Sequence, residues 1–308
     1  MSNKPLLSIC IPTYNRVEYL KKSLDSIINS TGFNEFEVEI VVSDNASTDG
    51  TREVVLGYST RHSNIKYFRN EENIRDKNFP MVISEATGLF RKLCNDTLLF
   101  EKDTVRRILD IIKENYLEKP VIFFNNKNYG YIKVFSLEDF LNKVSFNITW
   151  IGGLGVWDDF CSNIFNDFEG CNQSLWQVPF VLNYVDQKKN CLIVNEHFCT
   201  IQTIEKKDIS YGLYKVFYEN YLGFIKAYVS KGLVSQSCLD FLEEDLLFNF
   251  FPIWLYKFER QDKCLDYLKD ENLFELVLNA YKGKKYYRKF IFRYNFFKIK
   301  QFIRKILK

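Results

Sequence analysis

The sequence predicts an α/β fold in which a doubly wound, mostly parallel sheet is followed by a C-terminal helical extension. Two apolar, β-branched runs, 6–12 and 37–43, each end abruptly in a polar loop that leads into a helical pattern. Strand and helix patterns alternate over residues 1–125, as they do in parallel sheets built with right-handed crossovers. From 211 to 281 the pattern is helical throughout, which predicts the extension.

The individual elements follow from the spacing of apolar residues and from the breakers between them. Apolar runs predict strands at 6–12, 37–43, 65–68, 89–93, 121–124 and, last in the chain, 191–195. Apolar residues at helical spacing predict helices at 17–29, 76–86, 102–114 and 172–185. Ser47 or Thr48 is expected to cap a further helix with Asp49 in its first turn. Gly88 is expected to close the helix 76–86 in a left-handed conformation.

Size and composition narrow the class of protein. With 308 residues, the chain can bury a substantial core, and its apolar stretches are shorter than the roughly 20 residues that span a bilayer. The first residues lead directly into the first strand, so no secretory signal is expected. The eight cysteines are scattered without a C-x-x-C pair, which favours reduced thiols over disulfides or a structural zinc site. We therefore expect a cytoplasmic protein.

A candidate ligand site lies where the first two strands end. Thr13, Tyr14 and Asn15 follow the first strand, and Asp44 follows the second. The carboxyl ends of parallel strands meet at one edge of a sheet, where ligands bind. A tyrosine ring can stack on a base, and a carboxylate can accept hydrogen bonds from a base N–H or a sugar hydroxyl. These residue types predict a nucleotide site, whereas the neighbouring Ser47 and Asp49 are expected only to form a turn and a helix cap.

Five segments together resemble the inverting family 2 glycosyltransferases of the GT-A, Rossmann-like fold. The resemblance covers about residues 6–125 and is carried by Ser8–Arg16, Val42–Thr51, Asn73–Asn78, Ala86–Gly88 and the loop around Asp96. It implies transfer of a sugar, with inversion, from a nucleotide-diphosphate donor, a UDP-sugar being expected. The implied acceptor is a growing surface glycan such as capsule or lipooligosaccharide. On this basis 1–210 is expected to be the catalytic domain, 211–281 a helical extension and 282–308 a membrane-associating tail.

The resemblance also implies which residues bind the donor. Nucleotide contacts are expected from Pro12, Thr13, Tyr14, Asn15 and Asp44. In the segment 73–78, Arg75 or Lys77 is expected to neutralise the diphosphate, with a solvated loop as the alternative.

A divalent cation, Mn²⁺ or Mg²⁺, is the implied cofactor. The family's Asp-x-Asp metal motif is reduced here to Cys94-Asn95-Asp96, so Asp96 is the expected metal ligand and Asn95 a further donor contact. His197 stands where some GT-A enzymes place a late metal-binding histidine, and a structural histidine is the alternative. Departure from the motif weakens the expectation of tight metal binding.

Inverting transfer needs a carboxylate that takes the proton of the acceptor hydroxyl. The acidic pair with which the family opens a helix after the acceptor loop is absent, because the matching helix begins Gly170-Cys-Asn-Gln-Ser174. Two nearby carboxylates, Glu169 and Asp159, are therefore the expected catalytic residues.

The tail carries a charge unlike that of the rest of the chain. Residues 282–308 hold eleven Lys or Arg and no acid, while the other residues hold 31 bases against 39 acids. Its apolar residues recur at helical spacing: Tyr287, Phe290, Ile291, Tyr294, Ile299, Phe302, Ile303 and Ile306. Such a helix lies in the plane of an anionic bilayer, here the inner face of the plasma membrane, where a lipid-linked acceptor would be within reach. Packing on the domain with snorkelled lysines is the alternative, and nucleic acid is not an expected partner because the body is acidic.

Two other functions remain open from the sequence. A non-catalytic member that binds a nucleotide or glycan and scaffolds a membrane assembly would explain the reduced metal motif and the missing acidic pair. A sugar nucleotidyltransferase ranks last, because no Gly-rich, Lys-containing phosphate loop follows the first strand.

Overall fold

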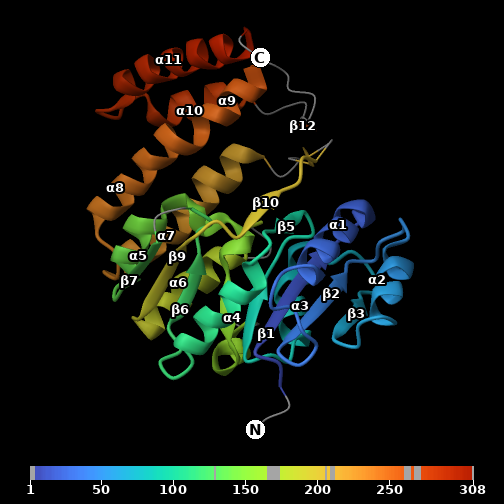
Figure 1. The fold of residues 1–308 in the computed structure, drawn as a ribbon. Coiled ribbons are helices and arrows are strands. Elements are labelled where there is room, and N and C mark those ends of the chain that lie inside the picture. The colour runs from blue at the N-terminus through green and yellow to red at the C-terminus, as the bar shows by residue number, and fades with distance from the viewer. Residues whose placement is uncertain are drawn as a thin grey trace. The chain divides into compact units, whose positions relative to one another are not determined.

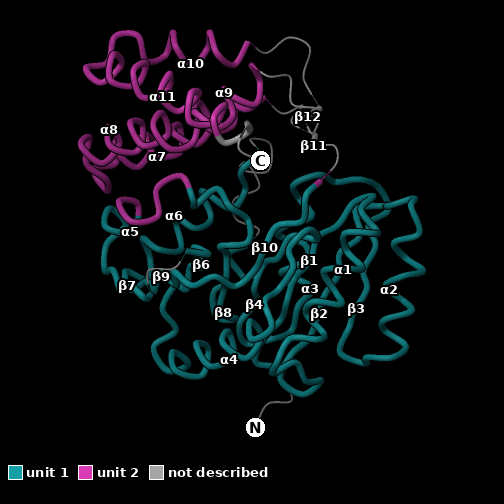
Figure 2. Tube along the Cα trace, turned by 45° about the horizontal axis from the view of Figure 1, so that its top comes forward, with its two compact units in different colours: residues 1–140, 147–203 teal, residues 141–146, 204–308 magenta. Residues whose placement is uncertain are grey.

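The computed structural model describes residues 4–127, 130–164, 174–204, 207–208, 212–259, 265–266 and 272–306. The chain divides into two compact units (Figure 2). Unit 1 comprises residues 1–140 and 147–203, and unit 2 comprises residues 141–146 and 204–308.

Unit 1 is built on a five-stranded sheet (Figure 1). Its order is β3 (Ile65–Arg69), β2 (Val38–Asp44), β1 (Leu7–Thr13), β4 (Phe90–Leu93) and β8 (Gly155–Trp157). The first four strands run parallel, and β8 pairs with β4 antiparallel. The predicted α/β class with a mostly parallel, doubly wound sheet is confirmed.

The winding of the sheet changes direction once. From β1 to β2 to β3 the chain moves one way, through the crossover helices α1 (Val17–Ile28) and α2 (Thr51–Ser59). It then returns through α3 (Asn78–Glu85), which contacts β1 and β2, to place β4 on the other side of β1. In open α/β sheets ligands bind at this topological switch point, outside the carboxyl ends of the strands. Here that point lies between β1 and β4.

The two central strands explain why the sheet forms where it does. Every residue of β1 and β2 is buried, as expected for strands covered on both faces by helices. Their register pairs Leu7 with Val38 and Thr13 with Asp44, so both strands end at the same level. Polar side chains that follow these strands are therefore placed side by side.

The remainder of unit 1 contains further helices and two small sheets. Its elements are η1 (Arg75–Lys77), β5 (Leu98–Phe100), α4 (Thr104–Glu114), β6 (Val121–Phe124), β7 (Gly130–Val134), η3 (Ile151–Gly153), η4 (Asp158–Asn163), α6 (Gln177–Lys188), β9 (Cys191–Asn195) and β10 (Cys199–Ile201). Strand β9 is central in the order β6-β9-β7, and β10 pairs antiparallel with β5. The predicted strand 191–195 is thus present but is not the last one.

Unit 2 is mainly helical. It contains α7 (Tyr221–Ser230), α8 (Gln236–Asp245), α9 (Phe251–Glu259), α10 (Leu273–Tyr281) and α11 (Tyr287–Ile306), with π-helical turns η6 (Lys215–Asn220) and η7 (Leu246–Phe250). Helix α5 (Leu137–Val144) runs from unit 1 into unit 2. A short parallel pair, β11 (Lys207–Asp208) with β12 (Leu265–Asp266), shows that 211–281 is not helical throughout. Within the described ranges, no helix combines the length and apolar character needed to cross a membrane.

Two local predictions are corrected. Gly88 does not adopt the left-handed conformation; it is required because a Cβ there would lie 2.3 Å from Ser8 Oγ and 2.9 Å from Ser8 N. Asp49 precedes α2 instead of standing in its first turn, and its Oδ1 accepts the Thr51 hydroxyl at 2.6 Å. The cysteines that the structure describes are free thiols, in agreement with the expectation from their spacing.

Candidate functional site

The loops that follow β1, β2 and β4 meet at the switch point of the sheet. The Thr13 hydroxyl donates a hydrogen bond to Asp96 Oδ2 at 2.9 Å, and this bond bridges the ends of β1 and β4. The Asn45 N–H donates to the Thr13 carbonyl at 2.9 Å, which joins the ends of β1 and β2. The sequence predicted that these three loops share one crevice, and the hydrogen bonds place them together.

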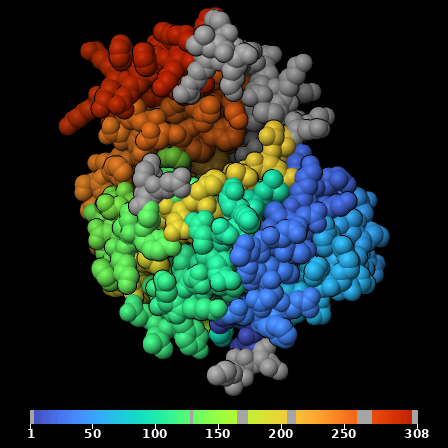
Figure 3. All heavy atoms as spheres, in the orientation of Figure 1, coloured from blue at the N-terminus to red at the C-terminus, as the bar shows by residue number. Residues whose placement is uncertain are grey.

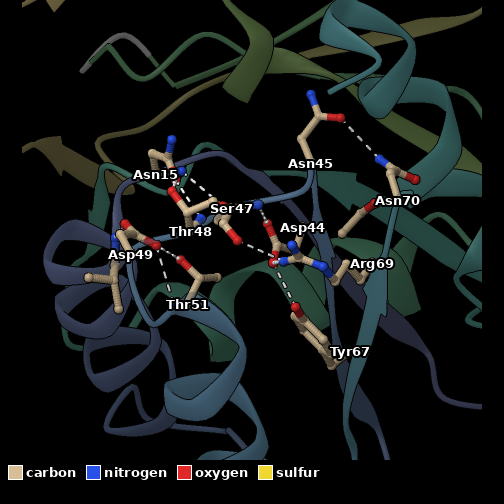
Figure 4. Close-up of polar contacts among 12 residues, drawn as sticks. Asn15, Asp44, Asn45, Ser47, Thr48, Asp49, Thr51, Tyr67, Arg69 and Asn70 are labelled. Carbon is tan, nitrogen blue, oxygen red and sulfur yellow. Dashed lines mark hydrogen bonds and ion pairs between the residues drawn. The ribbon is translucent and has the colours of Figure 1, made fainter. Parts of the chain in front are cut away.

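A second set of bonds fastens the β1 loop to the β2 loop (Figure 4). The Asn15 N–H donates to Ser47 Oγ at 2.9 Å, and Asn15 Oδ1 accepts the Thr48 N–H at 2.8 Å. Asn15 has a φ of 49°, a left-handed conformation that asparagine tolerates better than most residues. Asp49 Oδ2 accepts the N–H of Val17, the first residue of α1, at 2.8 Å. Ser47 and Asp49 therefore hold the two loops together, in agreement with the expected structural role. The expected cap is wrong in detail, because the N-cap of α2 is Gly50 and neither Ser47 nor Thr48 caps that helix.

Asp44 is fully buried at the centre of this arrangement. Its Oδ2 accepts hydrogen bonds from the Tyr67 hydroxyl at 2.6 Å and from Arg69 Nη1 at 2.8 Å, while its Oδ1 accepts the Ser47 N–H at 2.8 Å. Arg69 Nη1 also donates to the Ser47 carbonyl at 2.8 Å. Burial and the hydrogen bond to Asp44 raise the pKa of Tyr67 to about 12. The first role of Asp44 is thus to hold the end of β3 against the β2 loop, and its contact with a nucleotide stays a prediction.

Tyr67 and Arg69 were not identified from the sequence. Both lie on β3, and Arg69 is the last residue of that strand. The signal that could have found them is topological: β3 is parallel to β2 and ends at the same edge, with Arg69 in register with Asp44.

Asparagine side chains hold the segment 70–78 against the end of β2. Asn45 Nδ2 donates to Asn73 Oδ1 at 2.7 Å, and Asn45 Oδ1 accepts the Ile74 N–H at 2.9 Å. Asn70 Nδ2 donates to Asn45 Oδ1 at 3.1 Å and to Asn78 Oδ1 at 3.0 Å. These amide hydrogen bonds tie the segment to the end of β2.

A pocket of about 360 Å³ is lined by residues 72–77 together with Ser174. Arg75 and Lys77, expected to bind the diphosphate, both line it with exposed side chains. Arg75 has a φ of 52°, an uncommon conformation for a residue with a Cβ. Between them, burial raises the pKa of Asp76 to about 6, although the Arg75 charge opposes the shift. The solvated-loop alternative and the diphosphate role are both compatible with these positions.

Asp96 is only 2 % exposed and lies directly at the switch point. Besides the bond from Thr13 to Oδ2, its Oδ1 accepts a hydrogen bond from Arg16 Nη1 at 3.2 Å. Burial raises the pKa of the Asp96 carboxyl, and the opposing effects of Arg16 and Thr13 do not cancel that rise. Arg16, which precedes α1, belongs to the quoted first motif, but its pairing with Asp96 was not foreseen.

The other residues around Asp96 decide how a cation could be held. Cys94 is fully buried, and this burial raises the pKa of its thiol well above its ordinary value. Asn95 is half-buried beside it. Among the described residues, no group of three or more His, Cys, Asp or Glu side chains is arranged around a common point. A site here would therefore rely on one carboxylate, with oxygen atoms of the ligand and water supplying the rest.

His197 is not brought to this point. Strands β5 and β10 pair antiparallel, with Leu98 opposite Ile201 and Phe100 opposite Cys199. This register puts Asp96 near one end of the pair and His197 near the other. His197 Nε2 instead lies 3.3 Å from Glu101 Oε1. The two expected metal ligands do not converge on a single ion.

Asp159, one of the two expected catalytic carboxylates, lies away from the ends of β1 and β2. Strand β8 is antiparallel to β4 with Trp157 opposite Phe90, so Asp159, in η4, lies near the amino end of β4, opposite to the edge that bears Asp96. There Asp159 Oδ2 pairs with Lys188 Nζ at 2.9 Å. The structure thus does not bring Asp159 to the crevice. Glu169 lies outside the described residues.

The expected donor contacts of the first motif, residues 12–15, lie at the end of β1 and directly after it. Pro12 and Thr13 end the strand in register with Ser43 and Asp44. Tyr14 is exposed just beyond them. A ring that faces solvent beside the end of a parallel sheet is placed where a planar ligand could stack on it.

Comparison with known proteins agrees with this geometry. Residues 8–152 match the model of the family described as Glycosyl transferase family 2. The segment of residues 8–152 therefore belongs to glycosyl transferase family 2. The match covers β2, β3, β4 and all of β1 except its first residue, together with the loops that follow β1, β2 and β4.

Relatives and neighbours extend the likeness. The abequosyltransferase RfbV of Salmonella typhimurium is 48% identical over 85 residues, which are 27% of this chain and 25% of that protein. The match therefore spans a quarter of the relative's length. The crystal structure of S. aureus TarS 1–349 in complex with UDP superposes with a TM-score of 0.60 at 18% identity, covering 92% of this chain and 87% of that one. The mannosyltransferase PcManGT from Pyrobaculum calidifontis, in complex with GDP-Man and Mn²⁺, gives 0.55 at 14% identity, covering 96% and 87%. These two likenesses show the GT-A fold.

Proposed function

We propose that this protein transfers a sugar, with inversion, from a nucleotide-diphosphate donor to a growing surface glycan. The observation that carries the proposal is the Thr13 to Asp96 bond at the switch point of a family 2 domain, which joins the loops expected to bind the donor. A relative named an abequosyltransferase and neighbours solved with UDP and with GDP-Man support a nucleotide-sugar donor. A UDP-sugar remains our first choice, and capsule or lipooligosaccharide our expected acceptor.

In this proposal the nucleotide lies across the ends of β1 and β2. Tyr14, exposed beside the crevice, would stack on the base. Pro12, Thr13 and Asn15 would shape the loop that receives it, and Asn15 keeps that loop in place through its bonds to the β2 loop. Asp44 has no exposed surface, and Tyr67 and Arg69 bind its carboxylate. It would therefore contact the nucleotide only at the edge of this hydrogen-bonded group.

The diphosphate needs positive charge. Arg75 and Lys77 line an adjoining pocket with exposed side chains and are our candidates for its anionic oxygens. A divalent cation, when bound with the donor, would neutralise the leaving diphosphate. The residues could hold such an ion through a single carboxylate. Asp96 would be the ligand, and Asn95, next to it in the chain, carries an amide oxygen. Thr13 binds Asp96 Oδ2 and Arg16 binds Oδ1, and a carboxylate offers about four lone-pair positions, so it can accept a cation as well.

The chain's own residues prepare this carboxylate. The Thr13 hydroxyl and the Arg16 guanidinium orient Asp96 and offset part of the cost of burying its charge. Because Arg16 is partly exposed, it can rotate away when another cation approaches Asp96. For the catalytic base, Glu169 remains a candidate from the sequence. Asp159 is not retained, since it lies near the opposite edge of the sheet.

The same proposal includes a peripheral location at the inner face of an anionic membrane, where a lipid-linked saccharide would be the acceptor. Its support is the charge of residues 282–308, with eleven bases and no acid.

The test is incubation of the purified protein with a panel of UDP-, GDP- and TDP-sugars and Mn²⁺, measuring release of the nucleoside diphosphate. We expect turnover with at least one donor and stabilisation by its nucleoside diphosphate. No release with any donor, and no stabilisation by UDP, GDP or TDP, would contradict the proposal.

A second candidate is a non-catalytic member that binds a nucleotide or glycan and scaffolds a membrane assembly. The observation that favours it is the pairing of Asp96 with Arg16 in a motif that has lost its other acid. Asp96→Ala separates the two candidates. An enzyme would lose turnover and its cellular phenotype, whereas a scaffold would keep the phenotype.

A further inference from the structure

The C-terminal helix α11 has two apolar faces, and the inner one packs within unit 2. Phe290 and Tyr294 are buried and stack on one another with ring centroids 5.7 Å apart. The ring of Phe290 also contacts that of Phe248 in η7, with centroids 6.0 Å apart, and the ring of Tyr294 contacts that of Phe274 in α10, with centroids 6.3 Å apart. The face predicted from the sequence to contact lipid included both Phe290 and Tyr294. These two residues instead anchor the helix to its own unit.

The outer face of α11 is apolar and exposed. Phe292 is 76% exposed, Phe296 63%, Ile299 57% and Ile303 49%. The spacings of four, three and four residues place these side chains in one stripe along the helix. Phe302, also exposed, lies beside the stripe. We call these five residues the outer stripe. In Figure 3 the side chains of the C-terminal residues (red) project from the surface.

Basic side chains border the outer stripe on one flank. Lys289, Arg293 and Lys300 are exposed and fall in one row, at spacings of four and seven residues. On the other side of the helix, Lys298 is turned toward Glu259 of α9, with its Nζ 3.4 Å from a carboxylate oxygen. Within the described part of α11 there is no acidic residue that could neutralise the row.

A stripe of three phenylalanines and two isoleucines in water calls for a partner. An apolar strip bordered by bases matches an anionic bilayer, in which side chains enter the acyl boundary while the cations remain at the headgroups. A second copy of the chain fits less well, because two stripes in contact would bring two basic rows together with no acid between them.

We propose that the outer stripe is the surface by which this protein docks on anionic lipid, with α11 lying in the plane of the interface. The inference rests on the peripheral location proposed above and assigns the residues that produce it. The apolar side chains supply the insertion, and Lys289, Arg293 and Lys300 supply the preference for anionic headgroups.

The experiment measures partition of the full chain onto vesicles by co-sedimentation. One set of vesicles is phosphatidylcholine alone and the other contains phosphatidylglycerol. The test variant is Phe292→Ser with Phe296→Ser, and its matched control is Phe36→Ser, which changes another exposed phenylalanine on unit 1. A second test uses the double variant Lys289→Gln/Lys300→Gln. Its control is the double variant Lys21→Gln/Lys22→Gln, which changes two exposed lysines of α1. All positions are exposed, so each variant is expected to fold, and circular dichroism verifies this.

We expect the wild type and both controls to bind anionic vesicles, with binding that weakens as salt is raised. The double serine variant should lose about tenfold or more in partition coefficient, and the lysine variant several-fold, on anionic vesicles.

If the wild type binds neither set of vesicles, the membrane location itself is wrong. If the serine variant binds like the wild type, the location stands and the outer stripe is refuted. If sedimentation equilibrium without lipid shows self-association that the serine variant abolishes, a second copy occupies the stripe. Donor turnover with a soluble acceptor is an independent readout, and its absence would count against the transferase alone.

Discussion

Two buried carboxylates of the sheet domain predict opposite responses to removal of their charge. Glu39 of β2 is 2% exposed and accepts the Ser8 hydroxyl at 2.5 Å, the Thr87 N–H at 2.5 Å and Lys66 Nζ at 2.7 Å. Burial alone would raise the pKa of Glu39, but these donors outweigh it and leave that pKa lowered. Asp96 is equally buried, yet burial dominates there and its pKa is raised. The protein therefore favours the charge on Glu39 and tolerates the charge on Asp96 at a cost.

The expected magnitudes follow from the partners. Glu39→Gln removes the negative charge that faces Lys66. It also places an amide N–H, itself a donor, opposite groups that can only donate to this site. Breaking a fully buried pair costs about 3–5 kcal/mol, but solvent screens Lys66, which is 39% exposed, so we expect a loss of about 2–3 kcal/mol. Asp96→Asn has the same shape, keeps an acceptor for Thr13 and removes a charge that burial disfavours. Its free energy of unfolding should change by less than about 1 kcal/mol, while turnover falls on the order of 10²-fold.

The assay is urea unfolding of the wild type and both variants, followed by circular dichroism across pH. Because the pKa of Glu39 is lowered on folding, its stabilising contribution is present above the unfolded pKa and is lost as pH falls through the folded pKa. The deficit of Glu39→Gln should therefore shrink in acid. For Asp96 the sign is reversed, so the stability of Asp96→Asn relative to wild type should be most favourable at neutral pH. If Asp96→Asn unfolds as easily as Glu39→Gln at pH 7, Asp96 is structural and the reasoning fails.

Three further predictions concern single contacts. Gly88→Ala should destabilise the fold by about 1–3 kcal/mol, because its Cβ would meet the backbone of Ser8; a melting temperature equal to that of the wild type would contradict the close approach. Asp76→Asn should gain stability relative to wild type as pH rises from about 4 to 6, since the raised pKa of Asp76 means that its charged form is disfavoured in the fold. A difference that does not vary over this range would exclude the shift. Tyr67→Phe should cost about 1–3 kcal/mol, because buried Asp44 loses one of its donors; urea midpoints measure this, and an unchanged midpoint would show that the 2.6 Å bond is dispensable.

Much of the sheet could be predicted because its signals are local. Apolar runs that end in polar loops placed the parallel strands within about a residue of their observed bounds, and the loops after β1 and β2 were recognised as neighbours. The convergence on Asp96 also followed from strand order, since parallel strands end at the same edge.

The errors arise where long-range pairing decides. Asp159 is close in sequence to the glycine-rich turn, but β8 returns antiparallel to β4 and takes it toward the opposite edge of the sheet. His197 follows β9, the central strand of the β6-β9-β7 sheet. The register between β5 and β10 places it away from Asp96. Neither register can be read from one chain. Likewise, helical spacing alone could not tell which of the two apolar faces of α11 packs inside unit 2.

Calorimetric titration of UDP, GDP and TDP, with Mn²⁺ present, into the wild type and Asp96→Asn tests the central claim most directly. We expect at least one nucleoside diphosphate to bind the wild type and to bind Asp96→Asn about tenfold or more weakly, while the variant remains folded. Absence of binding to the wild type, or equal affinity for both proteins, would contradict a donor site at the junction of β1, β2 and β4.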